Sequence, residues 1–268
     1  MEVTSESPLA ATRDLHMSGI TDLRSRRIGL ALSGGAVRGI AHIGVLKVLS
    51  EFGIRATVVA GTSVGSIIGA GLASGMSWSD LAKMAHEVFW PGLLYAPQLE
   101  RFCARYLPTS FEDLDLPFAA IATALPGKTT VTLMQGSLAS AISASCAVRV
   151  WRRPVALNGV KLKDGGISCV LPSVACREMG AEFIIASDVW ELSALLRGVG
   201  LAHTSPAAEH VYPSHYMRAV ASTDLLIQSA VPITGYVPAG DFVNRLISAG
   251  ERAARIALES QGNMDVSP

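Results

Sequence analysis

The sequence has no excess of charge of either sign and few charged residues of any kind. Its 268 residues include 22 Lys and Arg against 22 Asp and Glu, and charged residues make up 16% of the chain. Such a balance gives no overall field that attracts nucleic acid, so nucleic acid is not expected as a partner. Half of the residues are hydrophobic, and the length suits one large domain or two small ones with a substantial core.

Cysteine is scarce and shows no metal-binding pattern. The four cysteines, at positions 103, 146, 169 and 176, form no Cys-x-x-Cys pair and no ligand set with histidine. His203, His210 and His215 also lack zinc-like spacing. We therefore expect free thiols in a reducing compartment and no metal site.

Long uninterrupted hydrophobic runs are missing as well. Residues 1–27 are polar and lack the apolar core of a signal peptide. Residues 56–79 carry no charge, but five glycines and several hydroxyl residues interrupt them. This favours a buried strand, turn and helix over a membrane-spanning helix, so we expect a cytoplasmic protein that could dock peripherally on a membrane.

Apolar segments of strand length alternate with segments of helical spacing. Their order predicts an α/β fold with a mainly parallel sheet covered on both faces. We divide the chain into a polar N-terminal arm (1–27), one domain (28–260) and a C-terminal tail (261–268). The strands are expected near 28–32, 55–60, 118–125, 129–134, 182–189 and 223–231. The helices are expected near 37–53, 63–73, 77–89, 137–145, 171–180 and 240–260.

A serine lies between two glycines in the segment VVAGTSVGSIIGA, residues 58–70. A predicted strand precedes it and a predicted helix follows it, so Ser63 would lie on a sharp strand-to-helix turn. Such a turn exposes the hydroxyl and brings backbone N–H groups close to the reacting carbon. The same pentapeptide also occurs in tight loops without catalytic function, and alone it leaves both interpretations open.

A glycine-rich turn, LSGGAVRG at 32–39, joins the first strand to the first helix. Backbone N–H groups can converge on an anion at such a turn. The turn lacks the Gly-Lys-Ser/Thr ending of a phosphate-binding loop and the Gly-x-Gly-x-x-Gly spacing of a dinucleotide site. Because neighbouring parallel strands end side by side, an oxyanion hole facing Ser63 is the better interpretation.

Asp164 is followed by two glycines in the segment KLKDGGISCVLP. Asp-Gly most often marks a surface turn. Here a strand-like run precedes the aspartate and a helix follows, so Asp164 could lie at the same edge of the sheet as Ser63.

Together these three stretches resemble the patatin-like phospholipase family, in particular its bacterial single-domain members. That family has, in this order, a glycine-rich oxyanion loop ending in Arg-Gly, a Gly-x-Ser-x-Gly elbow and an Asp-Gly-Gly or Asp-Gly-Ala. The similarity extends from about residue 28 to residue 258 and implies a three-layer sandwich with the patatin-like fold. It implies a serine acyl hydrolase that acts on lipid esters of phospholipids or lysophospholipids without metal or organic cofactor.

The resemblance also assigns functions to individual residues. Ser63 would be the nucleophile and Asp164 its general base, and no histidine would take part. Water activated by Asp164 would then release the fatty acid from the acyl-enzyme. The oxyanion hole would be formed by Gly34, Gly35, Ala36, Val37, Arg38 and Gly39.

The chain departs from the family pattern in two places. Ala36 stands where the family usually has a third glycine, and alanine is strained there if the backbone φ is positive. The segment CAVRVWRRPV, 146–155, replaces an apolar run that contains Pro-Gly. It is either a solvated loop or a basic lip that binds anionic head groups or a membrane surface, and its arginines could lower the pKa of Asp164 and weaken this base. The lip would consist of Arg149, Trp151, Arg152 and Arg153.

Other functions stay open. A Ser–His–Asp triad would take its histidine from His203, His210 or His215, but it would leave the glycine-rich loop and the Asp-Gly-Gly unexplained. A catalytically weak lipid- or partner-binding protein of the same fold is consistent with Ala36 and the arginines. An acyltransferase with a non-water acceptor would use the same acyl-enzyme. We expect His42 and Asp188 to be structural.

Overall fold

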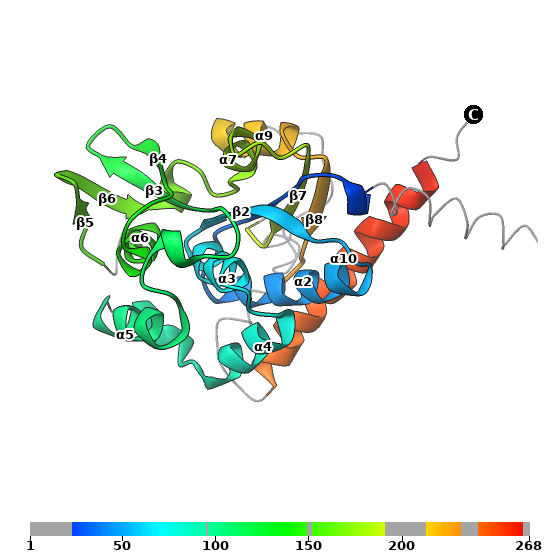
Figure 1. Cartoon of the computed structure of the whole chain (residues 1–268), viewed down its shortest axis with the longest axis horizontal. Coiled ribbons are helices and arrows are strands. Elements are labelled where there is room, and N and C mark those ends of the chain that lie inside the picture. Colours follow the sequence, from blue (N-terminus) through cyan, green and yellow to red (C-terminus); the bar gives the residue numbers. More distant parts are fainter. Residues whose placement is uncertain (1–22, 95, 149–151, 191–212, 232–240, 265–268) are drawn as a thin grey trace, which may run out of the picture.

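A single mixed sheet forms the centre of the molecule (Figure 1). The computed structural model describes residues 23–94, 96–148, 152–190, 213–231 and 241–264, and in these residues the sheet has eight strands. The spatial order is β5-β6-β3-β2-β1-β7-β8, and β4 pairs with β3. The parallel strands are β1 (Ile28–Leu32), β2 (Ala56–Thr62), β3 (Phe118–Leu125), β7 (Phe183–Asp188) and β8 (Leu225–Gln228). The antiparallel additions are β4 (Thr129–Leu133), β5 (Val155–Leu157) and β6 (Val160–Asp164).

Helices cover both faces of this sheet, which confirms the predicted three-layer α/β fold. Figure 1 shows α2, α3 and α10 on one face and α7 and α9 on the other. The helices are α2 (Ala41–Glu51), α3 (Val64–Ala73), α4 (Trp78–Glu87), α5 (Ala96–Tyr106), α6 (Leu138–Ser145), α7 (Ser173–Glu178), α9 (Ser214–Ala221) and α10 (Phe242–Met264). Short 3-10 helices are η1 (Ala36–Ile40), η2 (Trp90–Leu94), η3 (Phe111–Asp113) and η4 (Gly165–Ile167).

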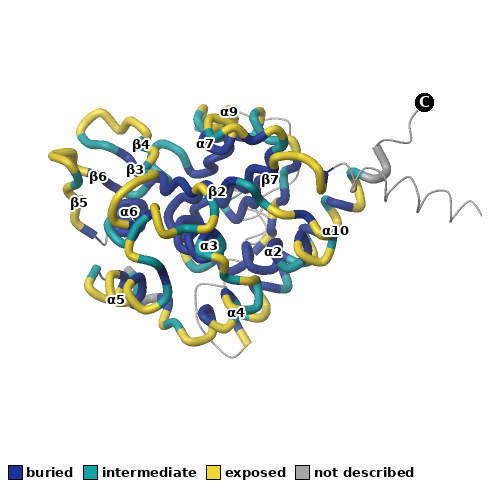
Figure 2. The backbone as a smooth tube through the Cα atoms, viewed as in Figure 1, coloured by how far each residue is buried: buried dark blue, intermediate teal, exposed yellow. Residues whose placement is uncertain are grey.

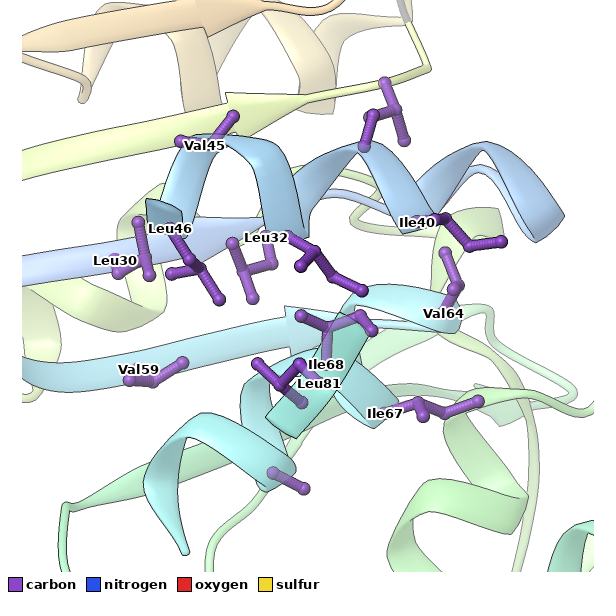
Figure 3. Packing of buried hydrophobic residues seen from close by; sticks show 14 of the residues in the cluster. Leu30, Leu32, Ile40, Val45, Leu46, Val59, Val64, Ile67, Ile68 and Leu81 are labelled. Atoms are coloured by element: carbon purple, nitrogen blue, oxygen red, sulfur yellow. The ribbon is translucent and has the colours of Figure 1, made fainter. Parts of the chain in front are cut away.

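The hydrophobic core has two main clusters because strand side chains alternate between the faces of the sheet, and a third, small cluster contains Ala122, Ala144 and Leu162. On β1, Leu30 and Leu32 belong to the large cluster with α2 and α3, whereas Ala31 belongs to the cluster beneath α7. Figure 2 shows the central strands buried and the peripheral loops exposed. Burying one such leucine stabilises the fold by about 1.5–3 kcal/mol. Figure 3 shows the large cluster, including Leu30, Leu32, Val45, Leu46, Val59 and Ile68.

Helix α10 packs along α2 at very short range. A Cβ atom added at Gly44 would lie 1.9 Å from the Ile247 carbonyl oxygen, and one at Gly250 would lie 1.8 Å from the Ala41 carbonyl oxygen. The two helix backbones are therefore in direct contact, which only glycine permits at these positions. Since α2 follows η1 directly, α10 supports the helix that begins at the glycine-rich loop.

The boundaries of the predicted elements agree closely with the sequence-based expectations, and the structure adds elements that were not expected. The expected capping of α4 is present, since Ser77 Oγ accepts the Asp80 N–H at 3.2 Å and Asp80 Oδ2 accepts the Ser77 N–H at 3.1 Å. Helices α5 and α9 and strand β5 were not predicted. No helix in the described part of the chain combines the length and hydrophobicity that a membrane-spanning segment needs.

The register of the sheet brings three loop segments to one edge. Leu32 at the end of β1 pairs with Gly61 of β2, and Thr62 of β2 pairs with Ile121 of β3. One residue further along β3, Ala122 pairs with Asp164. The residues that follow β1 and β2 therefore lie at the same level of the sheet as the end of β6.

Candidate active site

Ser63 has an uncommon backbone conformation at the turn between β2 and α3. Its φ is 53° and its ψ is −123°, and a non-glycine residue in such a sparsely populated region costs about 1–3 kcal/mol. Neighbouring groups hold this conformation. The Ser63 N–H donates to Ser145 Oγ at 2.8 Å, and the Ser63 carbonyl accepts the Ser66 N–H at 2.8 Å and the Ser66 hydroxyl at 2.6 Å.

The two glycines that flank Ser63 are required by close backbone contacts. A Cβ atom at Gly61 would lie 2.2 Å from the Gly65 carbonyl oxygen, and one at Gly65 would lie 2.3 Å from the Leu32 carbonyl oxygen. No side chain fits at either position. The Gly-x-Ser-x-Gly segment therefore folds tightly on itself and packs against the end of β1, where the glycine-rich loop starts.

Asp164 ends β6 and faces Ser63. A Cβ atom at Gly165 would lie 2.3 Å from the Ile121 carbonyl oxygen and 3.0 Å from Thr62 Cγ2, so the chain after Asp164 lies against the end of β2. The Asp164 carboxylate accepts the Gly166 N–H at 2.8 Å, and the Ser63 side chain lies near enough to favour the charged form of the carboxyl. The structure thus brings together the two residues that the sequence assigned to a dyad.

Burial raises the pKa of the Asp164 carboxyl above its ordinary value. The Ser63 side chain, the Gly166 N–H and the charges of Lys163 and Arg152 lower that pKa, but burial outweighs them. The charge of Arg152 therefore lowers the pKa of Asp164, as predicted, but the net shift of that pKa is upward because burial has the larger effect. A carboxylate with a raised pKa is a stronger base, and it is better suited to take a proton from a hydroxyl.

The glycine-rich loop lies directly beside Ser63. A Cβ atom at Gly34 would lie 3.5 Å from Ser63 Cβ. Two of the loop amides are already used, because the Gly34 N–H donates to the Val170 carbonyl at 2.9 Å and the Arg38 N–H to the Gly35 carbonyl at 3.3 Å. The Arg38 side chain also donates to the Gly35 carbonyl, at 3.2 Å, and so fixes this peptide.

Three amides of the loop remain as candidate oxyanion donors. No acceptor within the described ranges pairs with the N–H groups of Gly35, Ala36 and Val37. They follow one another at the start of η1, next to the turn that carries Ser63. Of the predicted set, the N–H groups of Gly34 and Arg38 are used and Gly39 lies further inside η1, so Gly35, Ala36 and Val37 are the candidates that remain.

Ala36 has a positive backbone φ, the conformation that favours the glycine usual at this position in the family. Its φ is 51° and its side chain is exposed. A left-handed backbone costs an L-residue about 1–2 kcal/mol. The question left open by the sequence is thereby answered: alanine at this position is strained.

The segment with the four predicted lip residues is only partly described. Arg149 and Trp151 lie outside the described residues, and Arg153 is exposed. Arg152 is only 8% exposed, and its guanidinium donates to Ser143 and Cys146 at the end of α6. Arg152 therefore does not belong to an exposed lip, because its charged group points into the protein.

His42 is a structural residue, as expected. Its Nε2 lies 3.0 Å from the Ser33 carbonyl oxygen and must donate to it, so Nδ1 accepts the Ser187 hydroxyl at 2.7 Å. Burial lowers the pKa of His42 to about 4, although the Ser33 carbonyl opposes this shift. A neutral His42 thus ties α2 to the ends of β1 and β7.

Asp188 and the other histidines offer no alternative to the dyad in the described residues. The Asp188 carboxylate accepts the Trp190 N–H at 2.8 Å and the Tyr216 hydroxyl at 2.6 Å, which indicates a structural function. His203 and His210 lie outside the described residues. Among the residues described, no hydrogen bond joins a histidine to Ser63 or Asp164, and no group of three or more His, Cys, Asp or Glu could hold a metal ion.

Sequence reasoning missed the hydroxyl groups that support the site. Ser145 holds the Ser63 amide, and Thr123 Oγ1 donates to the Asp164 carbonyl at 2.9 Å. Thr62 Oγ1 donates to the Cys169 carbonyl, also at 2.9 Å, and so joins β2 to the segment after Asp164. The serines spaced along 137–145 were visible, but nothing in the sequence indicated which of them faces Ser63.

Comparison with known proteins connects this geometry to a family. The family model described as patatin-like phospholipase matches residues 30–101, which include the glycine-rich loop and Ser63. The chain is 35% identical over 186 residues to human patatin-like phospholipase domain-containing protein 6, a match that covers 62% of this chain and 14% of that protein. It is 32% identical over 175 residues to an uncharacterized NTE family protein of Mycobacterium tuberculosis, with 60% and 49% covered.

These matches confirm the predicted resemblance to the patatin-like phospholipase family, although the chain spans at most about half the length of these relatives. A solved structure agrees with the fold. VipD from Legionella pneumophila superimposes with a TM-score of 0.62 at 15% identity, over 88% of this chain and 67% of that chain. At this identity the likeness supports the fold alone.

Replacing Ala36 by glycine should stabilise the protein. The exposed methyl group makes no buried contact, and glycine removes the cost of the positive φ at the expense of some backbone entropy. We expect Ala36→Gly to raise the free energy of unfolding by about 0.5–1 kcal/mol in urea denaturation. Ala156→Gly, at an exposed position of β5 without positive φ, is the matched control and should lower it. A loss of stability in Ala36→Gly would contradict the strain.

Proposed function

We propose that this relative of the patatin-like phospholipases is a serine acyl hydrolase that cleaves fatty-acyl esters of phospholipids or lysophospholipids. The juxtaposition of Ser63, on its strained turn, with the Asp164 carboxyl at the same edge of the sheet carries this proposal. The match to a family described as patatin-like phospholipase supports a lipid hydrolase. The dyad, the ester class of phospholipase A or lysophospholipase and the choice of substrate are the finer part of the proposal.

In the first half of the reaction, Ser63 Oγ attacks the carbonyl carbon of the ester. Asp164 takes the hydroxyl proton as the new carbon–oxygen bond forms. The negative charge moves to the carbonyl oxygen, where the N–H groups of Gly35, Ala36 and Val37 can donate to it. The intermediate then collapses, the bond to the leaving alcohol breaks, and that oxygen takes the proton from Asp164. The fatty-acyl group stays on Ser63.

In the second half, water replaces the alcohol. Asp164 removes a proton from the water as its oxygen attacks the acyl carbon, and the same loop amides hold the second oxyanion. Collapse returns the proton to Ser63 Oγ and releases the fatty acid. A single carboxyl group can serve both halves because it regains its unprotonated form after each of them.

The burial of Asp164 makes a dyad without histidine chemically reasonable. An aspartate in water is a very weak base toward a hydroxyl group. Removing the carboxylate from water raises its pKa, whereas the Gly166 N–H keeps one of its oxygens oriented. The environment of Asp164 thus makes its carboxylate more basic while the hydrogen bond from Gly166 keeps the carboxylate in place.

Replacement of either dyad residue should remove turnover without unfolding the protein. We expect Ser63→Ala and Asp164→Asn to lower kcat for a short-chain p-nitrophenyl ester by roughly a thousandfold or more, with an unchanged circular dichroism spectrum. Ser74→Ala, at the other end of α3, is the matched control and should keep its activity.

Labelling with a fluorophosphonate probe, followed by mass mapping, should find the adduct on Ser63 in the wild type. Full activity of Asp164→Asn would contradict the assignment of the base. A wild type that neither turns over esters nor takes the label, yet binds lipid vesicles, would instead identify a lipid-binding protein. Acyl transfer to added alcohols in preference to water would identify an acyltransferase.

The activity should fall with decreasing pH at a higher value than an ordinary aspartate would give. Asp164 acts as a base only when it is unprotonated, and burial raises its pKa. As the pH falls through that pKa, the carboxylate takes up a proton and kcat/KM declines. The midpoint of the acid limb, measured with folding followed in parallel, tests this. A midpoint at or below the range of solvent-exposed aspartates would contradict it.

We also propose peripheral contact with an anionic membrane surface, in which Arg153 takes part. Arg153 is exposed, and a basic residue near such a surface contributes about 1 kcal/mol. Arg153→Ala should therefore weaken binding to phosphatidylserine-containing vesicles about fivefold in a sedimentation assay. Arg252→Ala, an exposed arginine on α10, is the charge-matched control. Equal binding by both variants would favour the solvated loop.

A further inference from the structure

We propose that the buried Arg152 is a positioning residue for the nucleophile. It would act through the C-terminal end of α6 and the Ser145 hydroxyl, which holds the backbone of Ser63. The inference deepens the proposed function and rests on it, because it gives Arg152 and Ser145 the function of positioning Ser63. The sequence had suggested head-group binding for Arg152, and its burial favours this different function.

The Arg152 guanidinium binds the end of α6 at three points. Nη1 donates to the carbonyl oxygens of Ser143 at 3.1 Å and Cys146 at 3.4 Å, and Nη2 donates to Ser143 Oγ at 2.6 Å. The last carbonyls of a helix have no partner within the helix, and a cation there also interacts favourably with the helix dipole. Arg152 therefore fixes the position of the last turn of α6.

That last turn carries the acceptor for the strained amide of Ser63. Ser145 is the final residue of α6 and is fully buried, and its Oγ accepts the Ser63 N–H at 2.8 Å. The orientation of this N–H is tied to the positive φ of Ser63. A shift of the end of α6 would thus release the conformation that directs the Ser63 hydroxyl.

The same segment is joined to the other half of the dyad. The Asp164 N–H donates to the Ala147 carbonyl at 3.1 Å, and Lys163 Nζ donates to the Arg152 carbonyl. The backbone around Arg152 therefore contacts β6 while its guanidinium contacts α6. Arg152 thus joins α6, whose Ser145 holds the Ser63 amide, to β6, which ends at Asp164. A fixed Arg152 keeps these two elements at a fixed distance.

The charge of Arg152 provides a second, separable effect. It lowers the pKa of Asp164 and so opposes the effect of burial. Lysine keeps this charge but is a point charge that cannot hold Ser143 and Cys146 together, whereas methionine has neither property. Geometry and charge can therefore be tested with two variants at one position.

The first test measures the Ser63 amide and needs no activity. Hydrogen exchange of backbone amides is followed by NMR in the wild type, Ser145→Ala, Arg152→Lys, Arg152→Met and the exposed control Arg252→Met on α10. We expect exchange of the Ser63 amide to be at least about tenfold faster in the first three variants, since one hydrogen bond is lost or loosened. The amide of Leu30 in the sheet core reports global stability and should stay unchanged.

The second test measures catalysis and labelling in the same proteins. Both Arg152 variants and Ser145→Ala should lower kcat and the rate of fluorophosphonate labelling about tenfold at unchanged KM, because the nucleophile and not the substrate site is disturbed. Only Arg152→Met should move the acid limb of the pH profile to higher pH, since removal of the positive charge raises the pKa of Asp164. Arg252→Met should match the wild type in all of these measurements.

The outcomes separate this proposal from the proposed function. A wild type without esterase activity or labelling would contradict the acyl hydrolase, and the exchange of the Ser63 amide would still decide the function of Arg152. Unchanged Ser63 exchange in Arg152→Met would overturn the positioning function. So would an equal rise in exchange at Ser63 and Leu30, because Arg152 would then stabilise the whole fold and not this turn.

Discussion

The close contact between the Gly65 backbone and the end of β1 is the constraint on which the candidate site depends. A Cβ atom at position 65 would overlap the Leu32 carbonyl. The turn that carries Ser63 can therefore approach the glycine-rich loop only if residue 65 has no side chain. Gly165 makes a similar approach against Ile121. Three segments that are distant in the sequence thus meet at one edge because backbone lies directly on backbone, and this packing positions the groups of the candidate site.

The Asp164 carboxyl, which lies at this edge of the sheet, is subject to electrostatic effects that change its pKa in opposite directions. Burial of Asp164 makes its charge unfavourable, and two nearby cations together with the Ser63 side chain and the Gly166 N–H partly restore it. Neither effect alone suits a general base: complete desolvation would keep the group protonated, and full compensation would leave it weakly basic. The supporting cations are themselves buried, and Arg152 is satisfied largely by helix-terminal groups rather than by the aspartate.

The sequence predicted those parts of the site that depend on backbone shape. Ser63, Asp164 and the loop were found because few residue types fit a sharp turn or a close backbone approach, so the glycines mark them. Alternating apolar runs likewise predicted most of the sheet and most helices, although α5 and α9 were missed. The burial of Arg152 could not be predicted, since arginine is almost always exposed and its environment here comes from α6, a tertiary neighbour. For Ala36, the sequence posed the question of strain, and only the backbone φ answered it.

The contact between α2 and α10 has a consequence for how the protein is made. Gly44 and Gly250 place these helices backbone to backbone, and α2 begins where the glycine-rich loop ends. While the ribosome has released only the first two hundred residues, α2 has no partner on that side and the loop lacks its outer support. The candidate site therefore has its full support only after α10, the last helix of the described chain, has packed against α2.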